Sequence, residues 1–249
     1  MKYENIRPAI FLHRPNRFVA EIELDGRTEI CHVKNTGRCQ ELLIPGVRVW
    51  VQEQDSHKRK TKYDLITVQK GDRLVNIDSQ VPNKVVARWL PHSGLFRNLT
   101  AIYPEFRFGG SRFDFCVEEK ARRVLIEVKG VTLEQGGVAL FPDAPTIRGV
   151  KHLRELMTAV EQGYDAMVLF LIQMKNVSHM EPNWQTHEEF GLELRAARAA
   201  GVKILALDCH VTPDSIAPGN DVAVNLMPSM GQGANEPFFE KRLKDDFED

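Results

Sequence analysis

The chain has 249 residues, of which 43% are hydrophobic and 27% charged, and its formal net charge is −1. This composition is typical of a globular protein and excludes a fibrous or low-complexity chain. No apolar run is long enough to span a membrane and the N-terminus has no signal-peptide pattern, so we expect a cytoplasmic protein with no membrane partner. The four cysteines are scattered, without a Cys-X-X-Cys pair, which favours buried free thiols over zinc ligands or disulfides.

The first 80 residues contain six short runs rich in β-branched and aromatic residues, separated by turn signals. One of these signals, Asp25-Gly26, strongly indicates a hairpin. A short helical segment is expected over residues 38–43. So many short strands around so small a core predict a compact β-barrel of the OB type. The expected strands are Ala9–His13, Phe18–Leu24, Thr28–Val33, Val47–Gln52, Leu65–Gln69 and Leu74–Ile77.

A dense basic run lies between two of these strands and comprises Lys58, Arg59, Lys60 and Lys62. It belongs to a part of the chain, residues 1–80, whose net charge is +3, whereas the remainder carries −4. A cationic loop can lie along phosphates and gain affinity by releasing counterions. The alternative is a solvated loop that keeps the protein soluble. Because OB-type barrels often bind nucleic acid, we favour a nucleic-acid contact.

A second polar stretch surrounds Asn35-Thr36-Gly37, with Lys34 and Arg38 on either side. Short polar groups and a permissive backbone could hold a phosphate at the start of a helix. The alternative is an ordinary helix cap with Thr36 or Asn35 as the N-cap residue, and the chemistry alone favours the cap. Lys34, Asn35 and Arg38 remain candidate nucleic-acid contacts.

Residues 81–225 follow the order helix, three strands, helix, strand, helix, strand, and we expect a tail over residues 226–249. Antiparallel strands that lead into helical crossovers predict a mixed α/β sheet with helices on both faces. Residues 141–149 are expected to form a loop. The expected elements are a helix over residues 82–90, strands Ile102–Phe108, Arg112–Val117 and Arg123–Lys129, helix Val150–Gln162, strand Ala166–Ile172, helix Thr186–Ala200 and strand Val202–Leu207.

The two strands 112–117 and 123–129 form a hairpin that carries the strongest chemical signal. Glu127 and Lys129 share one face because side chains two apart on a strand point the same way. If the register sets Asp114 opposite Glu127, two carboxylates and an ammonium meet, an oxygen-ligand set that suits Mg²⁺ or Mn²⁺. Glu105, on the preceding strand, could reach the same face as a further metal ligand. The alternative is a half-exposed hairpin with a surface ion pair of little energetic weight.

An aspartate followed about a dozen residues later by Glu-X-Lys resembles the core of the PD-(D/E)XK nuclease superfamily. The expected order of helices and strands matches that core too, with Asp114 on its second strand and Glu127 and Lys129 on its third. The resemblance implies that Asp114, Glu127 and Lys129 are the catalytic set. In that reading the carboxylates hold Mg²⁺ or Mn²⁺, and Lys129 positions or deprotonates the attacking water.

A more specific resemblance covers about residues 5–210, over which the chain is identified as a member of the sugar fermentation stimulation protein A family. It implies an OB-like barrel, a nuclease-like domain, DNA binding without marked sequence preference and a regulatory role in sugar (maltose) metabolism. It also places Arg148, His152 and Arg154 near the site. The motifs that carry it are Arg17-Phe18, Asn35-Thr36-Gly37, Pro45-Gly46, Arg112-Phe113-Asp114-Phe115, Glu127–Leu133, Phe141–Ala144 and Arg148–Leu156.

Two positions depart from the patterns of these families. Nuclease-like members often carry a further acid on the helix before the sheet, and the matching place is expected to be Arg88 here. The glutamate that the family has in its Thr-X-Arg-Gly loop is Ile147 in this chain. Both departures weaken the case for a two-metal reaction.

The leading hypothesis is a cytoplasmic DNA-binding protein with a Mg²⁺-dependent phosphodiesterase site and no other cofactor; association with the nucleoid fits that hypothesis. The main alternative is a non-enzymatic DNA-binding regulator whose acidic cluster is a relic or a structural metal site. A third hypothesis is an RNA-processing nuclease that uses the same residues. Dependence on a divalent cation separates cleavage from simple binding. The sequence leaves open the oligomeric state and the physiological target.

Overall fold

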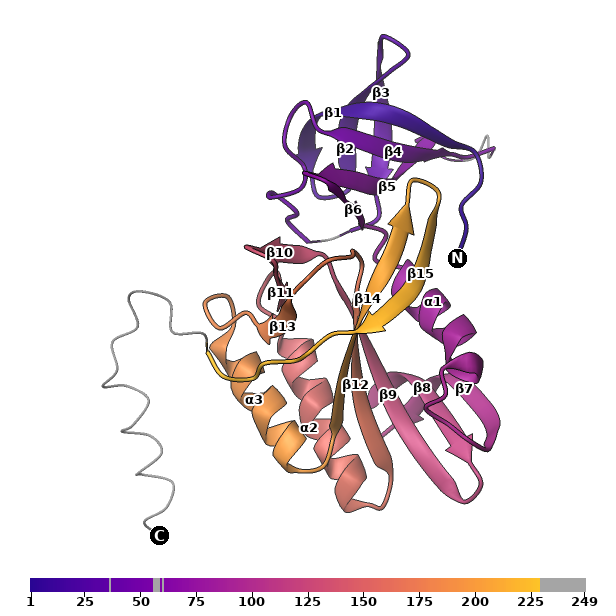
Figure 1. Ribbon diagram of the computed structural model, residues 1–249, viewed down its shortest axis with the longest axis vertical. Coiled ribbons are helices and arrows are strands. Elements are labelled where there is room, and N and C mark those ends of the chain that lie inside the picture. The colour runs from indigo at the N-terminus through magenta and orange to yellow at the C-terminus, as the bar shows by residue number, and fades with distance from the viewer. Residues whose placement is uncertain (36, 56–58, 60, 229–249) are drawn as a thin grey trace, which may run out of the picture.

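The computed structural model describes residues 1–35, 37–55, 59 and 61–228. Its N-terminal part is a six-stranded sheet in the order β3-β2-β1-β4-β5-β6, drawn in indigo and violet in Figure 1. A parallel pairing of β3 with β5 closes the sheet into a barrel, so the expected OB-like architecture is confirmed. The strands are β1 (Ile6–Asn16), β2 (Val19–Leu24), β3 (Arg27–Val33), β4 (Arg48–Glu53), β5 (Tyr63–Lys70) and β6 (Arg73–Asn76).

Local sequence explains the barrel strands, whereas one short helix expected in this part of the chain is absent. Ala20, Ile22 and Leu24 on β2 are buried in the barrel core, and the side chains between them face outward. The helix expected over residues 38–43 does not form, and these residues make a turn instead. Cys39 has a φ of +48°, which a right-handed helix cannot accommodate.

The second part of the chain forms a six-stranded sheet in the order β15-β14-β12-β9-β8-β7. Strands β9, β12 and β14 run parallel to one another, and β7, β8 and β15 pair antiparallel to their neighbours. The mixed α/β architecture is therefore confirmed. The strands are β7 (Leu99–Phe108), β8 (Ser111–Glu119), β9 (Arg122–Val131), β12 (Asp165–Ile172), β14 (Lys203–Thr212) and β15 (Ser215–Asp221).

Helices cover both faces of this sheet (Figure 1). Helices α2 (Ile147–Glu161) and α3 (Glu188–Ala199) pack on one face, where Leu153 and Phe190 join the buried core. Helix α1 (Val81–Trp89), followed by a short 3₁₀ turn at Leu90–His92, packs on the other face through Val85. Because both faces are covered, β12 is buried along almost its whole length, as its continuous apolar sequence predicts.

A small third sheet, β10-β11-β13, was not anticipated from the sequence. Its strands are β10 (Leu133–Gln135), β11 (Val138–Phe141) and β13 (His179–Pro182). Each has only three or four residues, too few for a periodic pattern to stand out. Strand β13 pairs in parallel with β11 from far along the chain, a contact that no local signal reports.

Buried polar contacts join the barrel to the second domain. Lys70 of β5 donates to Glu134 of β10 at 2.6 Å, and Arg73 of β6 lies 3.2 Å from the same carboxylate. From the end of β12, the Gln173 amide donates to the Asn76 carbonyl at 2.9 Å. Among the residues that the structure describes, none of the helices has the length and apolar content that a membrane span requires.

Candidate functional site

The β8–β9 hairpin brings Asp114 and Glu127 together at the point where its backbone pairing ends. Phe115 opposite Ile126 is the last backbone pair. Beyond it, the backbone N–H of Val128 donates to Asp114 Oδ2 at 2.7 Å in place of a strand partner. Phe113 packs on the side of α2, whereas Phe115 packs on the side of α1. Residues two apart on a regular strand face the same side, so the alternation of side chains is broken at Asp114.

A residue expected from the sequence only to start a helix completes the environment of Asp114. Asn83, in the first turn of α1, donates its amide to Asp114 Oδ1 at 2.5 Å. The resemblance to nuclease-like proteins pointed to Arg88 on the same helix, but Asn83 is the residue that reaches the carboxylate. Its only sequence signal was its position after Pro82.

Glu127 is held by two cationic or hydrogen-bonding partners on one oxygen. It is only 4% exposed, and its Oε1 accepts from Lys129 Nζ at 2.6 Å and from His152 Nδ1 at 2.5 Å. His152 lies on α2 and is also 4% exposed. Its Nε2 accepts from Arg148 Nε at 3.3 Å, which assigns the ring proton to Nδ1. Arg148, His152, Glu127 and Lys129 therefore form one hydrogen-bonded chain.

The pKa values of the two carboxyl groups are shifted in opposite directions. Burial raises the pKa of Asp114, and the nearby negative charge of Glu127 raises it further. Burial also acts to raise the pKa of Glu127, but the hydrogen bond from His152 and the Lys129 ammonium outweigh it, and the pKa falls below its usual value. The site thus keeps Glu127 ionised, whereas Asp114 takes up a proton more readily than an exposed aspartate.

One buried carboxylate oxygen in this cluster indicates a place where a cation could bind. Glu127 Oε2 is buried and has no hydrogen-bond partner among the described residues. A buried carboxylate oxygen without a partner is costly unless an ion or water completes it. Within the described ranges, no group of three or more His, Cys, Asp or Glu side chains could hold a metal ion. Two carboxylates are nevertheless enough for Mg²⁺, which keeps several waters and takes further oxygens from a substrate phosphate. Asp114 and Glu127 therefore fit a Mg²⁺ or Mn²⁺ centre.

Glu105 is not part of this two-carboxylate set. Its carboxylate pairs with Arg112 Nε at 2.7 Å, and its side chain is 54% exposed. Arg154 also lies apart, because its guanidinium binds Glu189 and Glu193 of α3. Arg148, in contrast, is exposed in the first turn of α2, directly beside His152. Of the three helix residues named from the sequence, Arg148 and His152 lie at the site and Arg154 does not.

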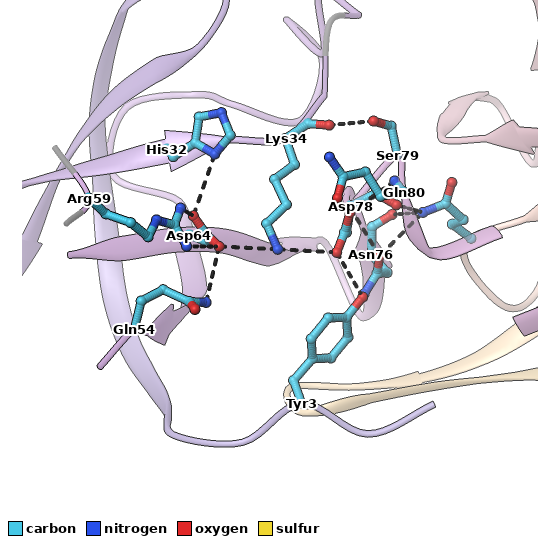
Figure 2. Close-up of polar contacts among 11 residues, drawn as sticks. Tyr3, His32, Lys34, Gln54, Arg59, Asp64, Asn76, Asp78, Ser79 and Gln80 are labelled. Atoms are coloured by element: carbon cyan, nitrogen blue, oxygen red, sulfur yellow. Dashed lines mark hydrogen bonds and ion pairs between the residues drawn. The ribbon is translucent and has the colours of Figure 1, made fainter. Parts of the chain in front are cut away.

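Two of the barrel residues that the sequence suggests as nucleic-acid contacts, Lys34 and Arg59, lie beside carboxylates of the chain itself (Figure 2). Lys34 Nζ lies 3.1 Å from Asp64 and 3.5 Å from Asp78, between two buried carboxylates. Arg59 folds back onto Asp64 as well. Burial favours a higher pKa for Asp64, but the hydrogen bond from Arg59 and the Lys34 charge hold that pKa below its usual value. The charges of Lys34 and Arg59 are thus balanced by buried carboxylates.

The remaining barrel candidates divide between paired and unpaired groups. Lys62 pairs with Glu53 at 2.7 Å, and Asn35 is buried, with its side chain accepting from the Gly37 N–H at 2.8 Å. Arg38 is exposed and forms no salt bridge in the part of the chain that is described. Lys58, Lys60 and Thr36 lie outside the described residues.

Comparison with known proteins covers both domains. The family model described as the SfsA N-terminal OB domain matches residues 12–77, and the sugar fermentation stimulation protein RE domain matches residues 80–215. A sugar fermentation stimulation protein homolog from Desulfitobacterium hafniense is 62% identical over 91% of this chain and 99% of that protein. One from Clostridium beijerinckii is 58% identical over 87% and 96%. The solved structure of Pyrococcus furiosus SfsA in complex with Ca²⁺ matches with a TM-score of 0.81 and 30% identity, over 90% of this chain and 98% of that one.

Proposed function

This chain belongs to the sugar fermentation stimulation protein family, and from that premise we propose that it is a DNA-binding protein with a Mg²⁺- or Mn²⁺-dependent phosphodiesterase site. The observation that carries the proposal is the buried, unpartnered Oε2 of Glu127 beside the carboxyl group of Asp114. The Pyrococcus furiosus relative, solved in complex with Ca²⁺, supports it, because Ca²⁺ also prefers carboxylate oxygens. The DNA would be bound without marked sequence preference.

Each residue of the site has a role that follows from its contacts. When bound, the metal ion would polarise a phosphate oxygen and lower the pKa of a water molecule. Lys129, which is 15% exposed, can turn its remaining N–H donors toward that water or toward the phosphate. Asn83 and the Val128 N–H fix the orientation of Asp114, and His152 fixes that of Glu127. Arg148 is exposed at the rim and suits a flanking phosphate.

A cleavage assay tests the proposal. The purified protein would be incubated with labelled single- and double-stranded DNA and RNA in the presence of Mn²⁺, Mg²⁺ or EDTA. We expect metal-dependent cleavage that falls at least about 100-fold in Asp114→Ala and in Glu127→Ala. Glu118→Gln is the matched control, because Glu118 lies on the same strand as Asp114 but pairs with Arg123 away from the site.

Three results would revise the proposal in different ways. Cleavage that survives both alanine substitutions would remove Asp114 and Glu127 from the reaction. Binding of DNA without cleavage under any metal condition would favour the non-enzymatic regulator. The observation that supports this alternative is that the site offers two carboxylates, since no group of three or more metal-binding side chains occurs among the described residues. Cleavage confined to RNA would make the protein an RNA-processing enzyme.

A further inference from the structure

A groove on the barrel surface lies outside the carboxylate site. It has a volume of about 490 Å³ and lies between the β1–β2 turn, the 37–40 segment and the loop before α2. Arg14, Arg17 and Arg38 line it, together with Ala144 from the second domain. Among the residues that the structure describes, no carboxylate side chain lines it. The groove is therefore cationic and crosses from the barrel to the second domain.

The arginines of this groove keep their charge available. Arg14 donates to the backbone carbonyls of Asn35, Gly37 and Arg38, so it ties the two barrel segments together through neutral acceptors. Arg17 and Arg38 are exposed, and neither forms a salt bridge in the described segments, although the Arg38 charge partly offsets the rise in the pKa of the nearby Asp143 that burial causes. Some exposed arginines elsewhere in the chain do pair with acidic side chains, as Arg112, Arg122 and Arg123 do. Unpaired arginines in a groove suit the phosphates of a nucleic-acid backbone.

An exposed aromatic ring lies beside this charge. Phe18 is 50% exposed although it is a large apolar side chain, and the Arg17 guanidinium lies 5.9 Å from the centroid of its ring. That separation is typical of a cation–π contact, which keeps ring and charge together. Exposed aromatic rings next to arginines stack on unpaired bases. A duplex offers no free base face away from its ends, so this pair of residues favours single strands.

The groove borders the loop that precedes α2. An added Cβ at Gly37 would collide with the Asp143 carboxylate, so the barrel loop lies directly against the Phe141–Ala144 motif. Ala144 lines the groove, and two residues later Thr146 caps α2, whose first turn carries Arg148. The groove therefore ends at the loop that leads into the first turn of α2, the helix that carries Arg148 and His152.

We propose that this groove holds an unpaired stretch of nucleic acid, with one base stacked on Phe18 and phosphates beside Arg17 and Arg38. The inference rests on the proposed function and sharpens it, because it makes a single strand, or a duplex with an unpaired end, the preferred substrate. Single-stranded DNA and single-stranded RNA both offer the unpaired bases and phosphates that the groove would bind. The binding experiment below distinguishes the two.

Binding in EDTA tests this without any cleavage. Fluorescence anisotropy would be measured on labelled single-stranded DNA, single-stranded RNA and duplex DNA of about 12 nucleotides. We expect Phe18→Ala to weaken single-strand binding about tenfold and to leave duplex binding unchanged. Phe18→Trp should restore the affinity. Ile30→Ala is the matched control, because Ile30 is 52% exposed on the same barrel.

The charge is tested separately by salt dependence. Replacing Arg17 and Arg38 by Gln should lower the slope of log affinity against log salt by about 0.7 for each arginine. Arg27→Gln/Arg48→Gln, exposed elsewhere on the barrel, should leave the slope unchanged. Equal effects of Phe18→Ala and Ile30→Ala, or tighter binding of duplex than of single strands, would overturn the groove assignment. A wild-type protein that binds none of the three nucleic acids would overturn the proposed function as well, which distinguishes the two failures.

Discussion

His152 is placed to support Glu127 without touching a substrate. It is almost fully buried, and both ring nitrogens are engaged, Nδ1 by Glu127 and Nε2 by Arg148. A phosphate could not approach it without displacing one of these partners. We therefore assign His152 as a positioning residue for Glu127, in the manner of the outer-shell groups that orient metal-binding carboxylates.

Substituting His152 tests this role through metal binding rather than activity. His152→Ala should weaken Mn²⁺ binding about 10- to 100-fold, because Glu127 loses a hydrogen bond that fixes its orientation. His152→Asn offers an amide donor in a similar place and should recover part of the affinity. Isothermal titration with Mn²⁺ measures both. Arg154→Ala, on the same helix but bound to α3, serves as the control. Unchanged Mn²⁺ affinity in His152→Ala would reduce the histidine to a packing role.

Single residues of the site could be predicted where spacing along one element decides the geometry. Glu127 and Lys129 do interact, as alternation along a strand requires. The spacing also predicts that Arg154 and His152 point to different sides of their helix, because two residues along a helix turn through about 200°. The surroundings of Lys34 could not be predicted, because its partners Asp64 and Asp78 come from distant parts of the chain. The contact of Asn83 with Asp114 could not be predicted for the same reason, since the two residues lie on different elements.

At the scale of elements, the start of α2 is the part of the fold on which the site most depends. Thr146 caps the helix by accepting from the Gly149 N–H at 3.0 Å. Gly149 packs so closely that an added Cβ would lie 2.8 Å from Thr146 Oγ1 and 3.2 Å from the Phe190 ring on α3. Because Arg148 and His152 both lie within one turn of Gly149, this contact sets their position.

Gly149→Ala should therefore be costly. We expect it to lower the free energy of unfolding by about 2 kcal/mol, because the first turn of α2 must move away from α3 to make room. Urea denaturation measures the change. Gly110→Ala is the control, since its added Cβ would meet only the flexible ends of Glu155 and Lys151, at 3.3 and 3.4 Å. Equal losses in the two variants would contradict the close packing inferred at Gly149.

Elements were predictable when their pattern was long. Strand β12 and helix α2 have enough residues for an apolar run or a helical repeat to be unambiguous. Strands β10, β11 and β13 are too short, and they form through pairing between distant segments. The helix expected over residues 38–43 failed at a single backbone angle, the positive φ of Cys39, which residue type does not disclose.

For the molecule as a whole, the central question is whether barrel and second domain act as one body. One continuous apolar core contains Ile22 and Leu65 of the barrel together with Leu153 and Phe170 of the second domain. The polar contacts at Glu134 and Gln173 add to this connection. A groove that crosses from one domain to the other can hold a strand in a fixed path only if the two are joined in this way.

Glu134 provides a test of that union through pH. Burial acts to raise its pKa, but Lys70, the Gly137 N–H and Arg73 lower it below the usual value. A carboxyl group with a lowered native pKa stabilises the fold above its unfolded pKa of about 4.3, and that contribution is lost as the pH falls through the native value. Glu134→Gln should thus cost about 2 kcal/mol at neutral pH, and the difference from wild type should shrink in acid.

The measurement is urea denaturation of both proteins at steps between about pH 7 and pH 3, followed by far-ultraviolet circular dichroism and by tryptophan fluorescence. If the domains unfold as one body, both probes should give the same transition and both should move in Glu134→Gln. Glu23→Gln, an exposed position on the barrel, should change neither. A difference between wild type and Glu134→Gln that stays constant with pH would mean that the lost ion pair is not the cause. Two separate transitions in the wild type would mean that the barrel folds independently of the second domain. The path of a nucleic-acid strand across the two domains would then be fixed only when the nucleic acid itself binds.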